Sequence, residues 1–524
     1  MLSRFNSNNF LKDGELLPNA ILSIIFVSGL FIRFYHLGTQ SIWVDEAWLV
    51  EFSKVPFVDI ISGKFNQPIM FIILKLVGQM FGYTEASIRF IPALAGAFLI
   101  LSSYKLGRCF FDIQLSLLSA VMVAISPIAI AYSQEAGNYS ILMLIVSLYL
   151  RYFLLYMRNN NKRFLFYFGV FALIANYLHI YNIFILSALL IYITFIQRGN
   201  GRNRAVYLAI AIILVLSVPV IIAGLRVSEA LEGYYPQSVY AFSFPKLYEY
   251  VSAVVFSWLN APFPTMYVPH YNLTFLGKGV MTTVLNTVVA YFLFAVFLWS
   301  IVYNVIKNNK ETTLLVLIVV VYCGLAVFAA FRSNQFAERY FLVLLPLIYI
   351  LMIKAFLHEW KNGVGRFASY AIIVIVLAHF IVTYYQTRDE PLWKQAQVRI
   401  SANYLRKSIN RLNSNEKFAI LVPINYETPL VEFCLPDLKS HILWDNEYQS
   451  YLYNPKMFLL KFDDQKRYNL RLLTKDRLAK IDVLYVFTER GRDHIGYITE
   501  HLAGQFRLDG VFGEITKVYT YRRY

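Results

Sequence analysis

The chain has 524 residues, of which 58% are hydrophobic and only 15% are charged, and its mean hydropathy is +0.51. Soluble domains carry roughly 25% charged residues, so this composition excludes a soluble globular protein and predicts a polytopic membrane protein. The net charge of +16 does not indicate nucleic-acid binding, because the Lys and Arg residues lie mainly in short clusters between apolar segments. The three cysteines are far apart without a CxxC spacing, which favours neither a metal site nor a disulfide framework.

A membrane-spanning helix needs about 20 mostly apolar residues, and about eleven segments of this chain fit that description. They are residues 17–34, 88–110, 115–131, 139–156, 164–177, 181–196, 205–224, 280–305, 313–331, 340–356 and 368–385. The segment 68–81 is apolar but short, and we expect a helix lying at the membrane interface. The expected fold class is therefore a polytopic α-helical membrane protein.

Basic residues between the predicted spans indicate the orientation. If the N-terminus is cytoplasmic, the clusters at 105–108, 151–163 and 198–204 lie inside, in agreement with the positive-inside rule. The polar segments that then gather at the outer face are the loops 36–87 and 226–279, the turns 132–138, 177–181 and 332–339, and the C-terminal segment. Side chains far apart in the sequence are thereby expected to meet at one membrane boundary.

The composition changes at Thr387, after which charges are frequent and apolar runs have the length of strands. The predicted elements are strands over 418–422, 483–487 and 516–521 and a helix over 393–411. We therefore expect two domains, a transmembrane domain over 1–386 and a small extracytoplasmic α/β domain over 387–524.

Two adjacent carboxylates, Asp45 and Glu46, lie between Trp43 and Trp48, directly after the first predicted span. Carboxylates near lipid are costly unless they face a cavity or a partner, so this pair is a candidate functional site. On position alone, a solvated loop anchored by interfacial tryptophans is an equally good interpretation.

Several short stretches resemble one family in their order and spacing over about three hundred residues. They are Arg33-Phe34-Tyr35-His36-Leu37 before Ser41-Ile42-Trp43-Val44-Asp45-Glu46, Gln67-Pro68-Ile69-Met70, Phe81-Gly82 with Glu85 and Ile88-Arg89-Phe90, Ser126-Pro127 before Tyr132-Ser133-Gln134-Glu135-Ala136, and Glu338-Arg339-Tyr340 before Pro346. The chain thus resembles the membrane glycosyltransferases of the GT-C type. The most similar group is the dolichyl-phosphate-mannose-protein mannosyltransferase-like group, which includes the bacterial aminoarabinose transferase.

This resemblance implies an enzyme that moves a hexose or pentose from a polyprenyl-phosphate donor to a lipid, glycan or protein acceptor at the outer face of the cell (inner) membrane. Asp45 matches the acidic position that activates the acceptor hydroxyl, which needs a base within hydrogen-bond reach. Glu46 is expected to support Asp45 or to bind an ion. No nucleic-acid partner is expected.

Glu135 matches an acidic position near the active site of the family. The alternative is a carboxylate at a helix N-terminus, where the macrodipole favours it. Together, Asp45 and Glu135 could hold a divalent cation such as Mg or Mn through oxygen ligands. No other cofactor is expected.

The leaving lipid phosphate calls for a cation, and Arg89 and Arg339 are the candidates because a guanidinium binds phosphate oxygens in a bidentate manner. His179, Tyr132 and Tyr181 are candidates for contact with the donor phosphate or sugar. For each arginine the alternative is interfacial anchoring, and for the others it is a structural histidine or an aromatic belt.

Two positions depart from the family pattern. Many relatives have His-Pro-Pro where this chain has Asn66-Gln67-Pro68, and relatives commonly have Arg where it has Gly137. These departures, above all the one at Gly137, support an inactive assembly subunit as an alternative. A non-catalytic transporter or flippase of lipid-linked sugars, which would share the many spans and a basic cavity, is a second alternative. Transporters place their substrate groups near the bilayer midplane, often in repeated halves, whereas here the polar groups lie at the outer boundary.

A reporter fused after Arg158 is expected to face the cytoplasm, because that residue lies in a basic cluster that the positive-inside rule keeps inside. Protease protection of the fusion in intact cells measures the side. Digestion from outside would overturn the orientation and each side assignment that depends on it.

Overall fold

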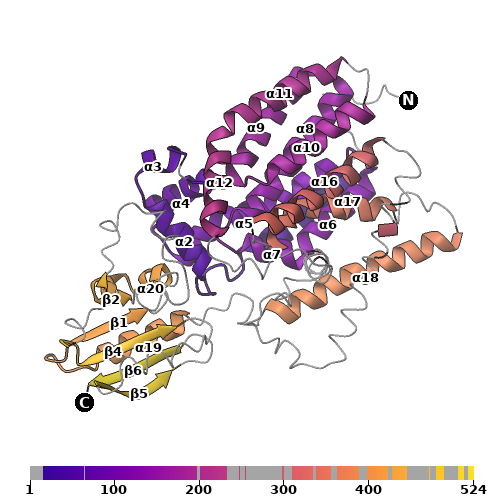
Figure 1. The fold of residues 1–524 in the computed structure, drawn as a ribbon. Coiled ribbons are helices and arrows are strands. Elements are labelled where there is room, and N and C mark those ends of the chain that lie inside the picture. Colours follow the sequence, from indigo (N-terminus) through magenta and orange to yellow (C-terminus); the bar gives the residue numbers. More distant parts are fainter. Residues whose placement is uncertain are drawn as a thin grey trace.

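The structure is a computed structural model of the chain (Figure 1). It describes residues 16–63, 65–197, 201–232, 310–333, 338–355, 363–388, 398–422, 428–444, 471–472, 479–488, 505–512 and 517–523, with isolated positions between 247 and 302. The predicted span 280–305 and most of the predicted loop 226–279 lie outside the described residues.

Helix α5 (Glu85–Gly107) is at the centre of the helical part. It packs against α1 (Leu16–Phe34), α6 (Ile113–Ile125) and α8 (Tyr139–Asn159). These segments are apolar. Lipid offers no hydrogen-bond partners to backbone N–H and C=O groups, and a helix pairs these groups within one segment. Helix α5 therefore packs against the first long helix and against two that follow it.

In the described part of the chain, four helices are long and apolar enough to cross a membrane, namely α1, α5, α8 and α16 (Lys310–Ser333). Two bent pairs raise this number to six if each pair is one span: α6 with α7 (Pro127–Ser133), and α11 (Arg202–Leu216) with α12 (Val218–Glu232). The other described helices of this part are α9 (Lys162–Leu178), α10 (Asn182–Ile191) followed by the π-helical η1 (Tyr192–Ile196), the 3-10 helix η3 (Glu338–Leu344), α17 (Leu345–Ile353) and α18 (Gly363–Arg388). The polytopic helical fold class is confirmed, whereas the number of eleven spans stays a prediction.

The segment 115–131, predicted as one span, is broken where α6 and α7 meet at 58°. Pro127 begins α7, and proline has no N–H with which to continue the preceding helix. The carbonyls of Val123 and Ala124 instead accept hydrogen bonds from the buried Arg33 guanidinium, at 2.9 and 3.2 Å. A side chain of α1 thus satisfies backbone groups that the break leaves open.

Three short helices follow α1, namely α2 (Val44–Ser53), α3 (Phe57–Ile61) and α4 (Pro68–Phe81). Helix α4 has the predicted bounds, and it leaves Leu76 and Met80 exposed. Its place at the membrane interface stays a prediction, with which this exposed apolar face agrees.

The C-terminal part is a six-stranded sheet with helices α19 (Val398–Ile409) and α20 (Thr428–Cys434). The other elements are η6 (Pro436–His441), β1 (Phe418–Val422), β2 (Ile442–Trp444), β3 (Arg471–Leu472), β4 (Val483–Thr488), β5 (Phe506–Phe512) and β6 (Lys517–Arg523). The strand order is β3-β2-β1-β4-β6-β5, with β3, β2, β1 and β4 parallel and β6 antiparallel to both of its neighbours. The predicted α/β fold of this part is confirmed, and β1 has the predicted bounds.

The described residues of the two parts meet at the short helix α2 and at the first residue of α5. Helix α20 packs against α2, and Figure 1 shows the sheet on the far side of this contact from the helical bundle. The segment that carries the predicted acidic pair therefore lies at the junction.

Candidate active site

The two neighbouring carboxylates at the start of α2 differ in burial. Glu46 is wholly buried, whereas the Asp45 side chain is 26% exposed. Successive residues of a helix point about 100° apart around its axis. Two neighbouring carboxylates can therefore face different surroundings, one the buried core and the other a partly exposed site.

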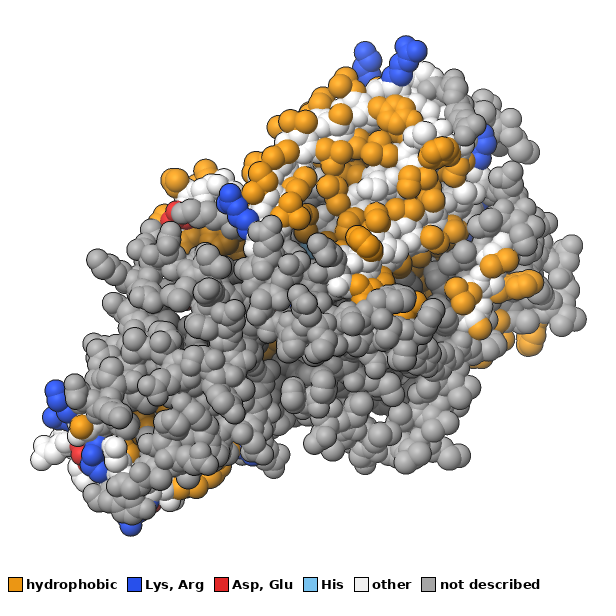
Figure 2. Space-filling model, viewed as in Figure 1, with side chains coloured by type: hydrophobic (Ala, Val, Ile, Leu, Met, Phe, Trp, Pro, Cys, Tyr) orange, Lys and Arg blue, Asp and Glu red, His pale blue; other side chains and the backbone are white. Residues whose placement is uncertain are grey.

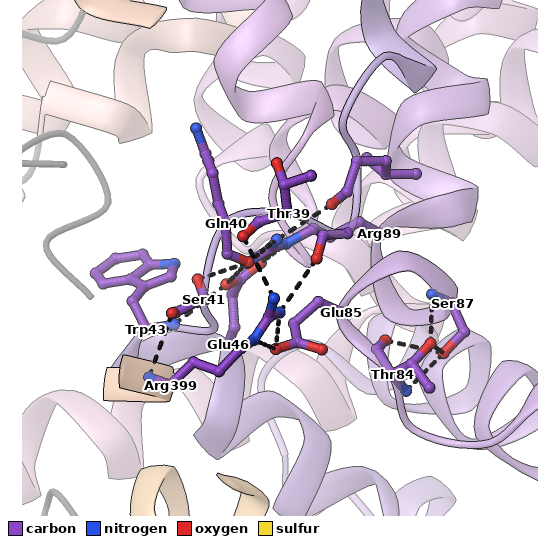
Figure 3. Close-up of polar contacts among 12 residues, drawn as sticks. Thr39, Gln40, Ser41, Trp43, Glu46, Thr84, Glu85, Ser87, Arg89 and Arg399 are labelled. Atoms are coloured by element: carbon purple, nitrogen blue, oxygen red, sulfur yellow. Dashed lines mark hydrogen bonds and ion pairs between the residues drawn. The ribbon is translucent and has the colours of Figure 1, made fainter. Parts of the chain in front are cut away.

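Glu46 forms an ion pair with Arg89 of α5, and both side chains are inaccessible to solvent (Figure 3). The Nε of Arg89 donates to Oε1 of Glu46 at 2.7 Å, and its Nη2 donates to Oε2 at 2.6 Å. Glu46 also accepts backbone N–H groups of Ala136 at 2.7 Å and Trp43 at 3.3 Å. The pair therefore joins the start of α2, the N-terminal end of α5 and the turn after α7.

The remaining donors of Arg89 bind the loop that precedes α2. Its Nη1 donates to the carbonyls of Leu37 at 3.2 Å and Gln40 at 2.8 Å, and its Nη2 donates to that of Ser41 at 3.0 Å. A guanidinium has five N–H donors, and here all five are used. The structure thus brings Glu46 and Arg89, predicted as a catalytic group and a phosphate ligand, to each other and to the backbone.

Asp45 pairs with a different arginine. Its Oδ2 lies 2.9 Å from Nη1 of Arg339, at the start of η3, and the Arg339 guanidinium lies over the Trp43 ring at 5.6 Å. The Nε of Arg339 is buried without a hydrogen-bond partner in the part of the chain that the structure describes. Unlike Arg89, Arg339 has a donor left for a ligand.

An aromatic wall lies beside this pair, formed by Tyr132, Tyr139, His179, Tyr181 and Tyr340. The centroid distances are 5.5 Å between Tyr132 and Tyr139, 6.1 Å between Tyr139 and His179, 5.2 Å between His179 and Tyr181, and 5.3 Å between His179 and Tyr340. The structure therefore brings the candidates His179, Tyr132 and Tyr181 into one wall, which also contains Tyr139 and Tyr340.

His179 follows the last residue of α9, and its Nδ1 accepts the backbone N–H of Tyr181 at 3.2 Å. Burial, and then the positive charge of Arg339, lowers the pKa of His179 to about 4. The imidazole is thus neutral at physiological pH, with its proton on Nε2, and can donate one hydrogen bond.

Glu135 lies half-buried in the turn between α7 and α8. The Tyr139 hydroxyl is within electrostatic range of Arg339, Glu135 and Asp45, which places Glu135 in the same neighbourhood as the ion pair. A Cβ on the neighbouring Gly137 would lie 3.3 Å from Oε1 of Glu135. The departure at Gly137 therefore lies directly beside a predicted site residue.

The predicted metal ligands do not form a cation site. Within the described ranges, no three His, Cys, Asp or Glu side chains come together as metal ligands. Divalent cations such as Mg and Ca prefer a shell of oxygen ligands, whereas a guanidinium occupies one carboxylate oxygen of Asp45. The Asp45 carboxylate is thus neutralised by an arginine.

Gln67 and Asn138 support the aromatic wall, and we did not predict this role. The Nδ2 of Asn138 donates to Oε1 of Gln67 at 2.9 Å and to the carbonyl of Leu178, next to His179, at 2.6 Å. The departure from the family pattern at Gln67 was the signal available in the sequence. Gln67 therefore helps to hold the turn of His179.

Residues 66–222 match the family described as dolichyl-phosphate-mannose-protein mannosyltransferase. The predicted resemblance is confirmed. The matched range contains Arg89, Glu135 and His179, whereas Asp45 and Arg339 lie outside it. No curated protein matches the chain in sequence.

The fold resembles that of ArnT from Cupriavidus metallidurans. The apo structure of ArnT superimposes with a TM-score of 0.58 at 11% identity, over 96% of this chain and 98% of that chain. ArnT bound to undecaprenyl phosphate gives a TM-score of 0.57 at 11% identity, over the same shares of the two chains. The archaeal oligosaccharyltransferase AglB from Archaeoglobus fulgidus, in complex with an inhibitory peptide and a dolichol-phosphate, gives 0.51 at 12% identity over 93% of this chain and 71% of that chain.

At these identities the superpositions show a shared fold of the GT-C type. Together with the family match over residues 66–222, this fold makes the chain similar to membrane glycosyltransferases of the GT-C type.

The Glu46→Gln variant is expected to lose roughly 3–5 kcal/mol of unfolding free energy, because removing one charge of a buried pair leaves the other unpaired. Asp45→Asn is expected to keep the wild-type unfolding temperature, since partly exposed ion pairs contribute little. Thermal unfolding of the purified proteins in detergent, followed by tryptophan fluorescence, measures the difference. Equal unfolding temperatures for the two variants would contradict the role of the Glu46–Arg89 pair.

Proposed function

We propose that this protein transfers a monosaccharide from a polyprenyl-phosphate donor to an acceptor hydroxyl, with Asp45 as the general base. The observation that carries the proposal is the pair of Asp45 and Arg339, in which a partly exposed carboxylate lies 2.9 Å from a guanidinium. A sugar transfer needs a base for the attacking group and a cation for the leaving group, and this pair provides both.

In the proposed step, the acceptor oxygen attacks the anomeric carbon of the sugar while Asp45 takes the hydroxyl proton. The bond between the anomeric carbon and the phosphate oxygen breaks, and the phosphate leaves with the electron pair. The second charge that develops on the phosphate is neutralised by Arg339, whose buried Nε has no partner among the described residues. When Arg339 turns to the phosphate, Asp45 becomes available to the acceptor.

The aromatic wall suits the sugar. Rings such as Tyr132 and Tyr181 can stack on the apolar face of a pyranose, and the neutral His179 can donate its Nε2 proton to a hydroxyl or phosphate oxygen. Glu135, near the same Tyr139 hydroxyl, is a second contact for acceptor or sugar hydroxyls.

The donor class follows from two similar proteins with lipid phosphates in their structures, ArnT with undecaprenyl phosphate and AglB with a dolichol-phosphate. A donor of this kind keeps its chain in lipid and brings its phosphate to the membrane boundary. The guanidinium of Arg339, at the end of a short apolar helical segment, lies where such a phosphate is expected.

We propose that the site faces the outside of the cell (inner) membrane, and the distribution of basic side chains supports this orientation. Figure 2 shows apolar side chains over α9 and α11 and basic side chains at the end of these helices that is farthest from the sheet. Basic ends favour the cytoplasm. We therefore propose that residues 387–524 form the extracytoplasmic domain and residues 1–386 the transmembrane domain.

The Asp45→Asn variant is expected to transfer sugar at least about a hundredfold more slowly than the wild type, because general-base catalysis contributes roughly 10²–10⁴ in rate. Purified protein is incubated with radiolabelled polyprenyl-phosphate sugars and membrane extract, and labelled acceptor is counted. The matched control is Glu51→Gln, which changes a carboxylate of the same helix that pairs with Lys54.

Near-normal transfer by a folded Asp45→Asn protein would remove the assignment of the base. A flippase or an inactive subunit of the same fold would label no acceptor in the wild type. The assay therefore distinguishes the proposed enzyme from both alternatives.

A chelator is expected to leave the transfer rate unchanged, because the Asp45 carboxylate is neutralised by a guanidinium and not arranged as a cation ligand. The rate is measured with EDTA and again after addition of Mg²⁺ or Mn²⁺. Loss of activity in EDTA and recovery with one of the ions would contradict the assignment of charge neutralisation to Arg339.

A further inference from the structure

The loop over residues 37–41, which leads into α2, has local turn hydrogen bonds to Phe34 and His36, but its carbonyl groups are held by side chains from elsewhere. Its five backbone carbonyls all accept hydrogen bonds from two guanidinium groups. Arg89 binds the carbonyls of residues 37, 40 and 41, and Arg399 binds those of Gly38 at 3.1 Å and Thr39 at 3.4 Å. The preceding residue His36 has φ of 56°, in the left-handed region that residues with a Cβ rarely adopt. External contacts therefore set the path of this loop.

Arg399 comes from the C-terminal part, where it is the second residue of α19. Its Nε lies 3.1 Å from Oε1 of Glu85, its Nη2 pairs with the same oxygen, and its backbone N–H donates to Oγ of Ser41 at 3.4 Å. Figure 3 shows Arg399 and Arg89 approaching the loop from different elements. Glu85 and Arg89 lie one turn apart on α5, so α5 anchors both guanidinium groups, one by a carboxylate and one directly.

The two contacts differ in burial. Arg89 and Glu46 are inaccessible to solvent, whereas the side chains of Arg399 and Glu85 are 38% and 17% exposed. Arg399 and Glu85 both line a cavity of about 190 Å³ between α5 and the helices α19 and α20. Solvent screens such a pair, so it adds little to the stability of the fold. Its effect is on geometry, because it fixes two carbonyls that Arg89 does not reach.

We propose that Arg399 is a positioning residue for the proposed transfer reaction, through which the C-terminal domain holds the loop that places Asp45 against Arg339. The loop ends four residues before Asp45, and Trp43 between them lies against Arg339. Arg89 binds this segment from the buried side, and Arg399 binds it from the partly exposed side. The C-terminal domain is thus part of the active site's framework and not a separate module.

The proposal rests on the proposed function, and it predicts a specific kinetic pattern for Arg399→Ala and Glu85→Gln. We expect kcat for sugar transfer to fall about tenfold or more, because a small displacement of a catalytic group is costly in rate. We expect KM for the polyprenyl-phosphate sugar to stay within about twofold, since neither change removes a proposed donor contact. Arg399→Lys keeps the charge but not the forked geometry, and an intermediate kcat is expected.

The matched control is Arg406→Ala, on the same helix, whose guanidinium pairs with Asp437 inside the C-terminal part at 2.5 Å. The control is expected to keep the wild-type kcat. Hydrogen exchange of the amides of residues 37–46 is measured on the same full-length proteins, and it is expected to be faster in Arg399→Ala and unchanged in Arg406→Ala. Unfolding temperatures of all four variants are expected to match the wild type.

Wild-type kcat and loop exchange in Arg399→Ala would overturn the positioning role and leave the proposed function intact. A fall in kcat accompanied by a lower unfolding temperature would also overturn it, since that pattern indicates general destabilisation. A wild-type protein that transfers no sugar would overturn the proposed function itself, and with it this inference.

Discussion

The fold around the candidate site depends on the buried ion pair between Glu46 and Arg89. Two charges without access to water are costly unless each is neutralised and every donor and acceptor is used. Here Arg89 uses all five donors, and Glu46 accepts two backbone N–H groups besides its partner. Because these bonds reach α2, α5 and the turn after α7, the start of α2 has one position relative to the bundle, and Asp45 is placed with it.

The same physical need recurs around the C-terminal end of α1. Where the chain leaves regular helix there, its carbonyl groups lose their intrahelical partners. Side chains from distant elements replace those partners. Arg33 donates to carbonyls at the break before Pro127. Gln134 donates to the carbonyls of Ile32, Arg33 and Tyr35. Arg89 and Arg399 donate to the carbonyls of the loop 37–41. Much of the positive charge at this boundary is therefore used to hold backbone.

This use of charge explains why the candidate residues separate into two groups. Sequence reasoning placed Asp45, Glu46, Arg89 and Arg339 at one membrane boundary, and the structure brings the four side chains together around the start of α2. It pairs them as Glu46 with Arg89 and Asp45 with Arg339, of which only the second pair is partly exposed. An arginine beside a predicted lipid site thus has two possible partners, a phosphate or a buried carbonyl, and burial and the number of free donors decide between them.

The sequence by itself determined the elements whose causes are local. Apolar length predicted α1, α5, α8 and α16, the bounds of α4 and β1 agree with prediction, and the spaced motifs predicted the family resemblance. The tertiary structure alone decided the pairings. Glu46 lies 43 positions from Arg89, and Arg399 lies about 360 positions from the loop that it binds. Such contacts depend on how whole helices pack, and adjacent carboxylates on one helix turn acquire different surroundings only once that packing exists.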